Sequence, residues 1–149
     1  MMSYPNVILL LNLTLSATLT GLIWMVQIVH YPGFLGVGTE QFLAYQHNHM
    51  RTISYVVVPL MLGELVVGLM LPFVYPSSWP WLVYTSAGLV LVIWITTFLV
   101  SSPLHGLLAS EGYNTERIER LVSTNWIRTA AWTVRTVILF YIVLTTMRS

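Results

Sequence analysis

Four long apolar stretches constrain the fold of this chain more than any other feature of its sequence. They cover residues 7–29, 52–73, 81–100 and 129–147, and each is close to the roughly 20 residues that a helix needs to cross a bilayer. Inside a bilayer the backbone must satisfy its own hydrogen bonds, so only helices and closed barrels span it. Continuous apolar runs favour helices over the alternating pattern of barrel strands. The sequence therefore predicts an all-α protein, a four-transmembrane-helix bundle with up-down-up-down topology.

Charged residues are too scarce to cover a soluble protein. Only 7% of the residues are charged, against about 25% in a typical soluble domain. The formal net charge is +1, so we expect the lipid bilayer as a partner and no nucleic acid. Cysteine is absent, which excludes disulfides and thiolate metal sites. We expect one integral, multi-pass membrane domain over residues 1–149; its first apolar run is longer than the roughly 7–15 residues of a signal-peptide core.

Prolines and glycines mark the predicted ends of these spans. Residues 30–33 (HYPG) should end the first span, residues 74–80 the second and residues 101–103 (SSP) the third. The second helix can begin as early as Glu40, because no helix breaker follows it directly. An amphipathic segment over residues 114–126 should belong to the last helix, with Asn114 or Thr115 as its N-cap.

An even number of spans places both termini on one side of the membrane and the 30–51 and 103–125 connections on the other. Arg51, Arg117 and Arg120 fall on the side of these connections, against Arg148 on the side of the termini. The positive-inside rule then predicts extracytoplasmic termini, and in a bacterium the membrane would be the cytoplasmic membrane.

All four histidines of the chain fall on the side of the two longer connections. They are His30, His47, His49 and His105. At about 100° per residue, His49 shares a helix face with Gln46 and with the deeper Glu64, whereas His47 points away.

The fourth span carries a polar stripe on an otherwise apolar helix. Asn125, Arg128, Trp132 and Arg135 recur at spacings of three, four and three residues, so the stripe should face the bundle interior. Glu64 lies at a depth where it can meet Arg135, and we expect the two to form a buried pair behind the site.

These residues allow three interpretations of the histidines. His30, His49 and His105 come from three spans and could bind Fe, Cu or Zn, or a haem, since imidazole is a ligand for all of these metals. A cofactor-free site is the alternative, in which His49 and His105 act as bases. The third interpretation gives the histidines structural roles alone.

In the cofactor-free alternative, Arg128 would stabilise an oxyanion and Asn125 would orient the substrate. Gln27, which lies one turn before His30, and Gln46 would contact the substrate. Tryptophans, chiefly Trp126 and Trp132 with Trp24 and Trp94, would line a pocket for a flat lipophilic molecule or a quinone. Aromatic residues at the span ends, Tyr31 among them, are typical of the membrane interface.

Two pairs of short motifs resemble a known family. Residues 102–108 (SPLHGLL) precede residues 125–131 (NWIRTAA), and residues 31–34 (YPGF) precede residues 42–46 and His49. This layout resembles the small four-helix membrane proteins that include the fungal anthrone oxygenases (DUF1772-like). In this chain His105 stands where that family tends to have Asn, His49 stands near another usual Asn, and Trp126 follows Asn125 rather than preceding it.

The resemblance implies a small integral membrane oxidoreductase, a monooxygenase acting on a lipophilic aromatic or quinone-like molecule. The alternative is a non-catalytic subunit of a larger membrane complex that binds a small ligand, metal or haem. A transporter or channel ranks third, because four spans would have to form a homo-oligomer to build a pathway.

Overall fold

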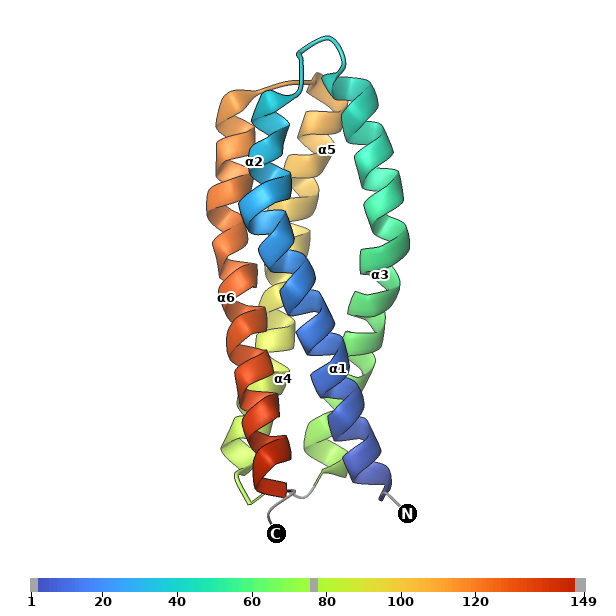
Figure 1. The fold of residues 1–149 in the computed structure, drawn as a ribbon, viewed down its shortest axis with the longest axis vertical. Coiled ribbons are helices and arrows are strands. Elements are labelled where there is room, and N and C mark those ends of the chain that lie inside the picture. The colour runs from blue at the N-terminus through green and yellow to red at the C-terminus, as the bar shows by residue number, and fades with distance from the viewer. Residues whose placement is uncertain (1–2, 76–77, 147–149) are drawn as a thin grey trace.

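Four helical rods form the protein in a computed structural model that describes residues 3–75 and 78–146. Within these residues the rods cover Tyr4–Gly36, Phe42–Val74, Pro80–Glu111 and Thr115–Thr146, and each is long and apolar enough to cross a membrane. Figure 1 shows neighbours along the chain running in opposite directions, with both ends of the chain at one end of the bundle. The predicted all-α, up-down-up-down fold is confirmed.

The first and third rods are interrupted by π-helical turns. The first consists of α1 (Tyr4–Met25), the π-turn η1 (Val26–His30), α2 (Tyr31–Gly33) and a short 3₁₀ turn, η2 (Phe34–Gly36). The third consists of α4 (Pro80–Thr96), the π-turn η3 (Thr97–Ser101) and α5 (Ser102–Glu111). The second and fourth rods are the unbroken helices α3 (Phe42–Val74) and α6 (Thr115–Thr146).

The predicted helix ends at residues 30–33 and 101–103 are wrong, because each rod continues through its proline. The Tyr31 amide donates to the Val26 carbonyl, and the Ser102 amide donates to the Thr97 carbonyl, five residues back in both cases. Such a wide turn shifts the hydrogen-bond register just before Pro32 and Pro103. A proline removes one donor and crowds the carbonyl four residues back. The π-turns therefore let the helices absorb both prolines.

The connections are consequently shorter than expected. Most of the predicted 30–51 and 103–125 connections is helical, and the linkers are residues 37–41 and 112–114. The second helix begins at Phe42, which confirms the expected early start near Glu40. This helix, α3, continues through Pro59 and Pro72. Asn114 caps α6 as expected, accepting a bond from the Arg117 amide at 2.9 Å. Gly112 has a φ of 87°, a backbone conformation that favours glycine at this turn.

The bundle interior contains two apolar clusters. One lies at the end that holds the histidines and includes Phe34, Phe42 and Trp132; the other lies toward the termini and includes Leu9, Leu71 and Leu139. A layer of buried polar residues on α1, α3 and α6 lies between them.

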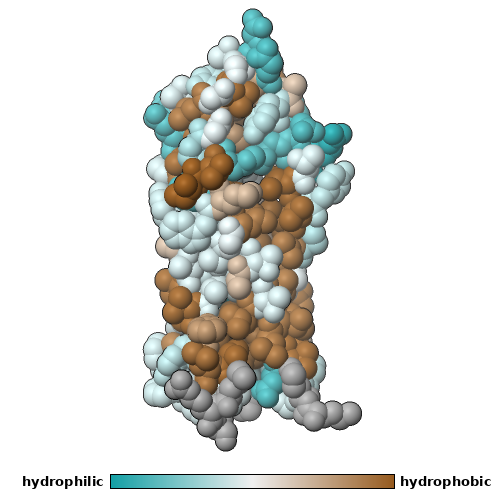
Figure 2. All heavy atoms as spheres, viewed as in Figure 1, coloured by the Kyte–Doolittle hydropathy of each residue, from teal (hydrophilic) through white to brown (hydrophobic). Residues whose placement is uncertain are grey.

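The outer surface is apolar on every rod. Large exposed side chains include Ile28 on the first rod, Tyr55 on the second, Phe98 on the third and Phe140 on the fourth. In Figure 2 hydrophilic residues gather at the upper end, and hydrophobic residues cover much of the face below. These features support a multi-pass integral membrane protein. The predicted span end at residue 147, Arg148 and residues 76–77 of the second connection lie outside the described residues.

Candidate functional site

Two histidines from different rods are in direct contact. The Nε2 atom of His30, at the end of η1, lies 2.8 Å from the Nδ1 atom of His49 on α3. His49 is buried, whereas His30 is partly exposed. One proton can therefore be shared between a buried imidazole and a partly exposed one.

The third histidine is fixed by two side chains. The Nε2 atom of Gln46 donates to the Nδ1 atom of His105 at 2.9 Å. The proton of neutral His105 is then on Nε2, which donates to the Tyr31 hydroxyl at 3.0 Å. The ring centroids of His49 and His105 are 5.6 Å apart, so all three predicted histidines lie together.

A chain of buried amides positions Arg128. Asn125 accepts a bond from the Arg128 Nε atom at 3.0 Å and a second, short one from Nη2. The Nδ2 atom of Asn125 donates to Gln27 at 2.8 Å, and Gln27 donates to the Val122 carbonyl at 3.0 Å. Gln27 and Asn125 therefore orient the guanidinium from behind.

Arg128 is a buried cation without a carboxylate partner among the described residues. The residue is only 6% exposed. Its Nη2 atom donates to the Tyr31 hydroxyl at 3.1 Å, and its Nη1 atom makes a longer contact of 3.4 Å with Thr97. Both partners are neutral groups, so among the described residues no carboxylate balances the charge of Arg128. An arginine inside a membrane protein usually pairs or marks a functional path.

A cavity of about 160 Å³ lies against these groups. Its polar end is formed by Tyr31, His49, Ser101, His105 and Arg128. Its remaining walls are chiefly apolar and include residues of the first, second and fourth rods: Leu19, Leu22, Ile23, Val26, Ile53, Val57, Val58 and Trp132. This combination of an apolar body and a few convergent polar groups is typical of a small-molecule site.

Hydrogen-bond donors at the polar end are left without protein partners. The buried Ser101 hydroxyl lines the cavity and has no partner among the described residues. The Tyr31 oxygen accepts bonds from His105 and Arg128, so its own proton is available. Together with the second Nη1 proton of Arg128, these donors favour an acceptor or anionic oxygen in the cavity.

The histidines do not have the geometry of a metal site. Within the described residues, no group of three or more histidine, cysteine or acidic side chains is placed to hold a metal ion. Both nitrogens of His105 are engaged by Gln46 and Tyr31, and His30 and His49 are bonded to each other. The expected convergence of His30, His49 and His105 on one ion is therefore not supported.

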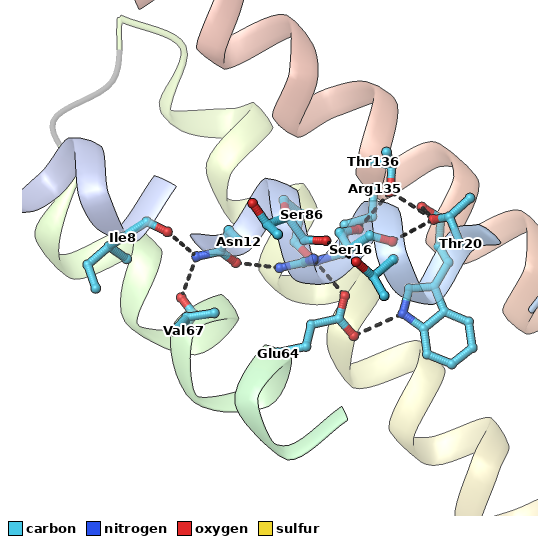
Figure 3. A network of polar contacts seen from close by, with 12 residues as sticks. Ile8, Asn12, Ser16, Thr20, Glu64, Val67, Ser86, Arg135 and Thr136 are labelled. Atoms are coloured by element: carbon cyan, nitrogen blue, oxygen red, sulfur yellow. Dashed lines mark hydrogen bonds and ion pairs between the residues drawn. The ribbon is translucent and has the colours of Figure 1, made fainter. Parts of the chain in front are cut away.

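Glu64 and Arg135 form the expected buried pair below the cavity. The Nη1 atom of Arg135 lies 2.7 Å from Glu64 Oε1, and both side chains are fully buried. Figure 3 shows Arg135 between Glu64 and Asn12, which accepts a bond of 2.6 Å from Nη2. The Trp132 indole donates to the second Glu64 oxygen at 2.9 Å. The ion pair thereby fixes the aromatic ring that lines the cavity.

Gly68 leaves the space that this pair requires. A Cβ atom at this position would lie 2.9 Å from Val90 Cγ2 and 3.0 Å from Arg135 Nη2.

Three of the four tryptophans that the sequence placed around a pocket lie outside the lining of this cavity. Trp126 is 46% exposed and packs edge-on against Trp24 at a centroid distance of 5.5 Å, outside the cavity. Of the four tryptophans expected to line a pocket, Trp132 lines this cavity, whereas Trp24, Trp94 and Trp126 do not. Gln27 and Gln46 also lie behind its polar end. His47 is exposed, as expected.

Sequence reasoning missed Tyr31, Thr97 and Ser101. Tyr31 is buried and links His105 to Arg128, although a tyrosine at a span end is typical of the interface. Thr97 and Ser101 belong to η3, which the sequence did not predict.

Comparisons with known proteins give no relative for this chain. No family model, curated protein or solved structure matches it.

Proposed function

We propose that this protein is a small membrane oxidoreductase, a monooxygenase that acts on a lipophilic aromatic or quinone-like molecule in the cavity. The observation that supports it most is the buried guanidinium of Arg128, which has no carboxylate partner in the described chain and lies at the polar end of an otherwise apolar cavity. A substrate that develops negative charge on an oxygen would supply the missing anion. The resemblance to the anthrone oxygenases suggests the same class of substrate.

His49 is the base in this proposal. Its Nδ1 atom is bonded to His30, whereas its Nε2 atom has no hydrogen-bond partner among the described residues, and the residue lines the cavity. His49 takes a proton from the substrate at Nε2 and passes the Nδ1 proton to His30, which is partly exposed. His105 has a different role, because both of its nitrogens are engaged: it holds the Tyr31 hydroxyl toward the substrate oxygen.

The proposed reaction needs molecular oxygen and no bound cofactor. Loss of a proton to His49 gives an enolate or phenolate whose oxygen is held by Arg128 and Tyr31. A ring carbon of this anion is oxidised by O₂, and a carbon–oxygen bond forms to give a hydroperoxide after protonation. Loss of the second proton from that carbon breaks the oxygen–oxygen bond and releases water. The substrate CH₂ group and O₂ are thus converted to C=O and H₂O.

Oxygen consumption tests this function directly. Purified protein in lipid nanodiscs should consume one O₂ for each molecule of a lipophilic phenol or anthrone that it converts to the quinone, faster than nanodiscs without protein. Arg128→Gln should lower the rate about 10²–10³-fold, as loss of an oxyanion donor does in other enzymes. His47→Gln is the matched control, because His47 is exposed and lies outside the cavity lining. An Arg128→Gln protein that is folded and fully active would overturn the proposal.

A non-catalytic, ligand-binding subunit remains the second candidate, and the same cavity supports it. Saturable binding of an aromatic ligand without oxygen consumption, together with partner proteins that copurify at a fixed ratio, would favour this function. A transport path is disfavoured by the apolar cluster around Leu9, Leu71 and Leu139, which separates the buried ion pair from the terminal end of the bundle.

A further inference from the structure

The cavity has a lateral opening between α3 and α5. Its most exposed lining residues are Ser54 and Val58 on α3 and Ser102 on α5. A neighbouring groove between the same two helices shares five lining residues with it: His49, Ile53, Ser54, Ser102 and His105. The groove and the cavity are therefore adjoining parts of one space.

This opening lies at the depth of the hydrocarbon core. A 33-residue rod is about 50 Å long, whereas the apolar core of a bilayer is about 30 Å thick. A centred bundle therefore extends about 10 Å beyond the core at each end. Ser54 is about 18 Å from the start of α3 at Phe42. Molecules that are dissolved in the bilayer can thus reach the cavity without crossing the interface.

The dimensions of the cavity limit what can enter its inner end. Its volume of about 160 Å³ is close to the roughly 150 Å³ of an apolar protein cavity that accommodates benzene. One aromatic ring fits this space, and a three-ring anthrone is much larger. An apolar substituent on a single ring would extend through the lateral opening into lipid.

The polar end selects for an oxygen anion. The side chains that line this end are Tyr31, His49, Thr97, Ser101, His105 and Arg128, and in the described residues no carboxylate lines the cavity. Tyr31, Ser101 and Arg128 each have a proton to donate, and Arg128 adds a positive charge. Trp132, which is held by Glu64, and Tyr31 add aromatic surface.

We propose that the ligand is a single-ring aromatic amphiphile with an ionised ring hydroxyl, which enters from the bilayer between α3 and α5 and binds with its oxygen on Arg128, Tyr31 and Ser101. This inference rests on the proposed function for the location of the site, but it changes the substrate class from three fused rings to one. It concerns binding, so it is testable without turnover.

An alkyl-substituted nitrophenol is a suitable probe, because its phenolate absorbs visible light and its phenol does not. Wild-type protein in nanodiscs should bind it as the phenolate at a pH where the probe in empty nanodiscs is protonated, a lowering of its apparent pKa by about one unit or more. Arg128→Gln should remove this shift. Tyr31→Phe, which loses one donor and keeps the ring, should reduce it and so separates recognition from misfolding.

Two competitors test whether the site requires a single aromatic ring. A hydroxyanthracene should compete at least tenfold more weakly than an alkylphenol of equal hydrophobicity. A fatty acid should also compete weakly, because it supplies an oxyanion without the ring. Equal competition by the three-ring compound would overturn the size argument, and equal competition by the fatty acid would identify a lipid carboxylate as the ligand instead.

Substitution at the opening tests the route. Ser54→Trp should slow probe association several-fold, whereas Tyr55→Trp, at a neighbouring position that is 73% exposed and outside the lining, should leave it unchanged. Equal association rates in the two variants would contradict lateral entry. A visible phenolate signal without oxygen consumption would support this inference while overturning the oxygenase function; anthrone turnover without probe binding would do the reverse.

Discussion

The His30 Nε2 and His49 Nδ1 atoms lie 2.8 Å apart, which joins a buried imidazole lining the cavity to a partly exposed one outside it. His30 is the last residue of the π-turn η1, and the rod that contains it packs against α3. In the proposed function, this contact would give a proton taken from a buried substrate a route out of the site.

The first prediction concerns this histidine pair. His49→Gln should lower the turnover number about 10²–10⁴-fold, the usual contribution of a general base. His30→Gln should lower it less, because the base remains and its proton leaves more slowly. Steady-state oxygen uptake measures both, with His47→Gln as the control. If His30→Gln were as active as wild type at every pH, the relay would be wrong.

A second prediction concerns the buried Glu64–Arg135 pair. Glu64→Ala should destabilise the protein by about 3–5 kcal/mol, because it leaves the Arg135 charge buried and uncompensated. The double variant Glu64→Met, Arg135→Met should be much closer to wild type, since both charges are removed and the volume is largely kept. Thermal unfolding in one detergent compares the variants. Additive losses in the double variant would show that the two residues are not coupled.

The third prediction concerns the space beside Arg135. Gly68→Ala should destabilise the bundle by about 1–3 kcal/mol, because the new methyl group would overlap Val90 and crowd Arg135. Gly21→Ala is the matched control on α1, where a Cβ atom meets nothing within 4 Å. It should leave the melting temperature unchanged or raise it slightly, since alanine favours helices. Equal melting temperatures for the two variants would contradict this packing.

Much of the bundle was predictable because it depends on local patterns. Apolar runs of spanning length indicated four helices, and the spacing of Asn125, Arg128 and Arg135 indicated their buried face. The same periodicity explains why Trp126 lies outside the cavity. Trp126 follows Asn125 directly, so it is rotated by about 100° off the stripe and onto the outer surface.

The π-turns were not predictable, because a proline in a sequence normally indicates the end of a helix. Tyr31 directly follows η1 and is buried, whereas η3 brings Thr97 into contact with Arg128 and Ser101 to the cavity wall. The cavity depends on how four rods pack around these turns, which no single segment encodes. The roles of His49, His105, Asn125 and Arg128 in catalysis stay predictions, although the structure brings these residues together.

Membrane orientation follows from the arginines and gives a fourth prediction. Arg51, Arg117 and Arg120 lie at the histidine end of the chain's helices, so we expect this end to be cytoplasmic and the termini extracytoplasmic. A reporter fused after residue 149 that is active only outside the cytoplasm should be active. Fluorescence from a reporter that fluoresces only in the cytoplasm, fused at the same position, would show the opposite orientation. The histidine end would then lie outside the cytoplasm.

Photo-crosslinking tests most directly whether the cavity is the binding site. An alkylphenol with a diazirine on its tail should label α3 near Ile53 and Val57 in nanodiscs, and excess unmodified alkylphenol should prevent this labelling. Arg128→Gln should abolish it, while labelling of the lipid-facing residues Val137 and Phe140 should be weak and not displaceable. Labelling spread evenly over lipid-facing residues, unchanged by Arg128→Gln or by the competitor, would contradict the account.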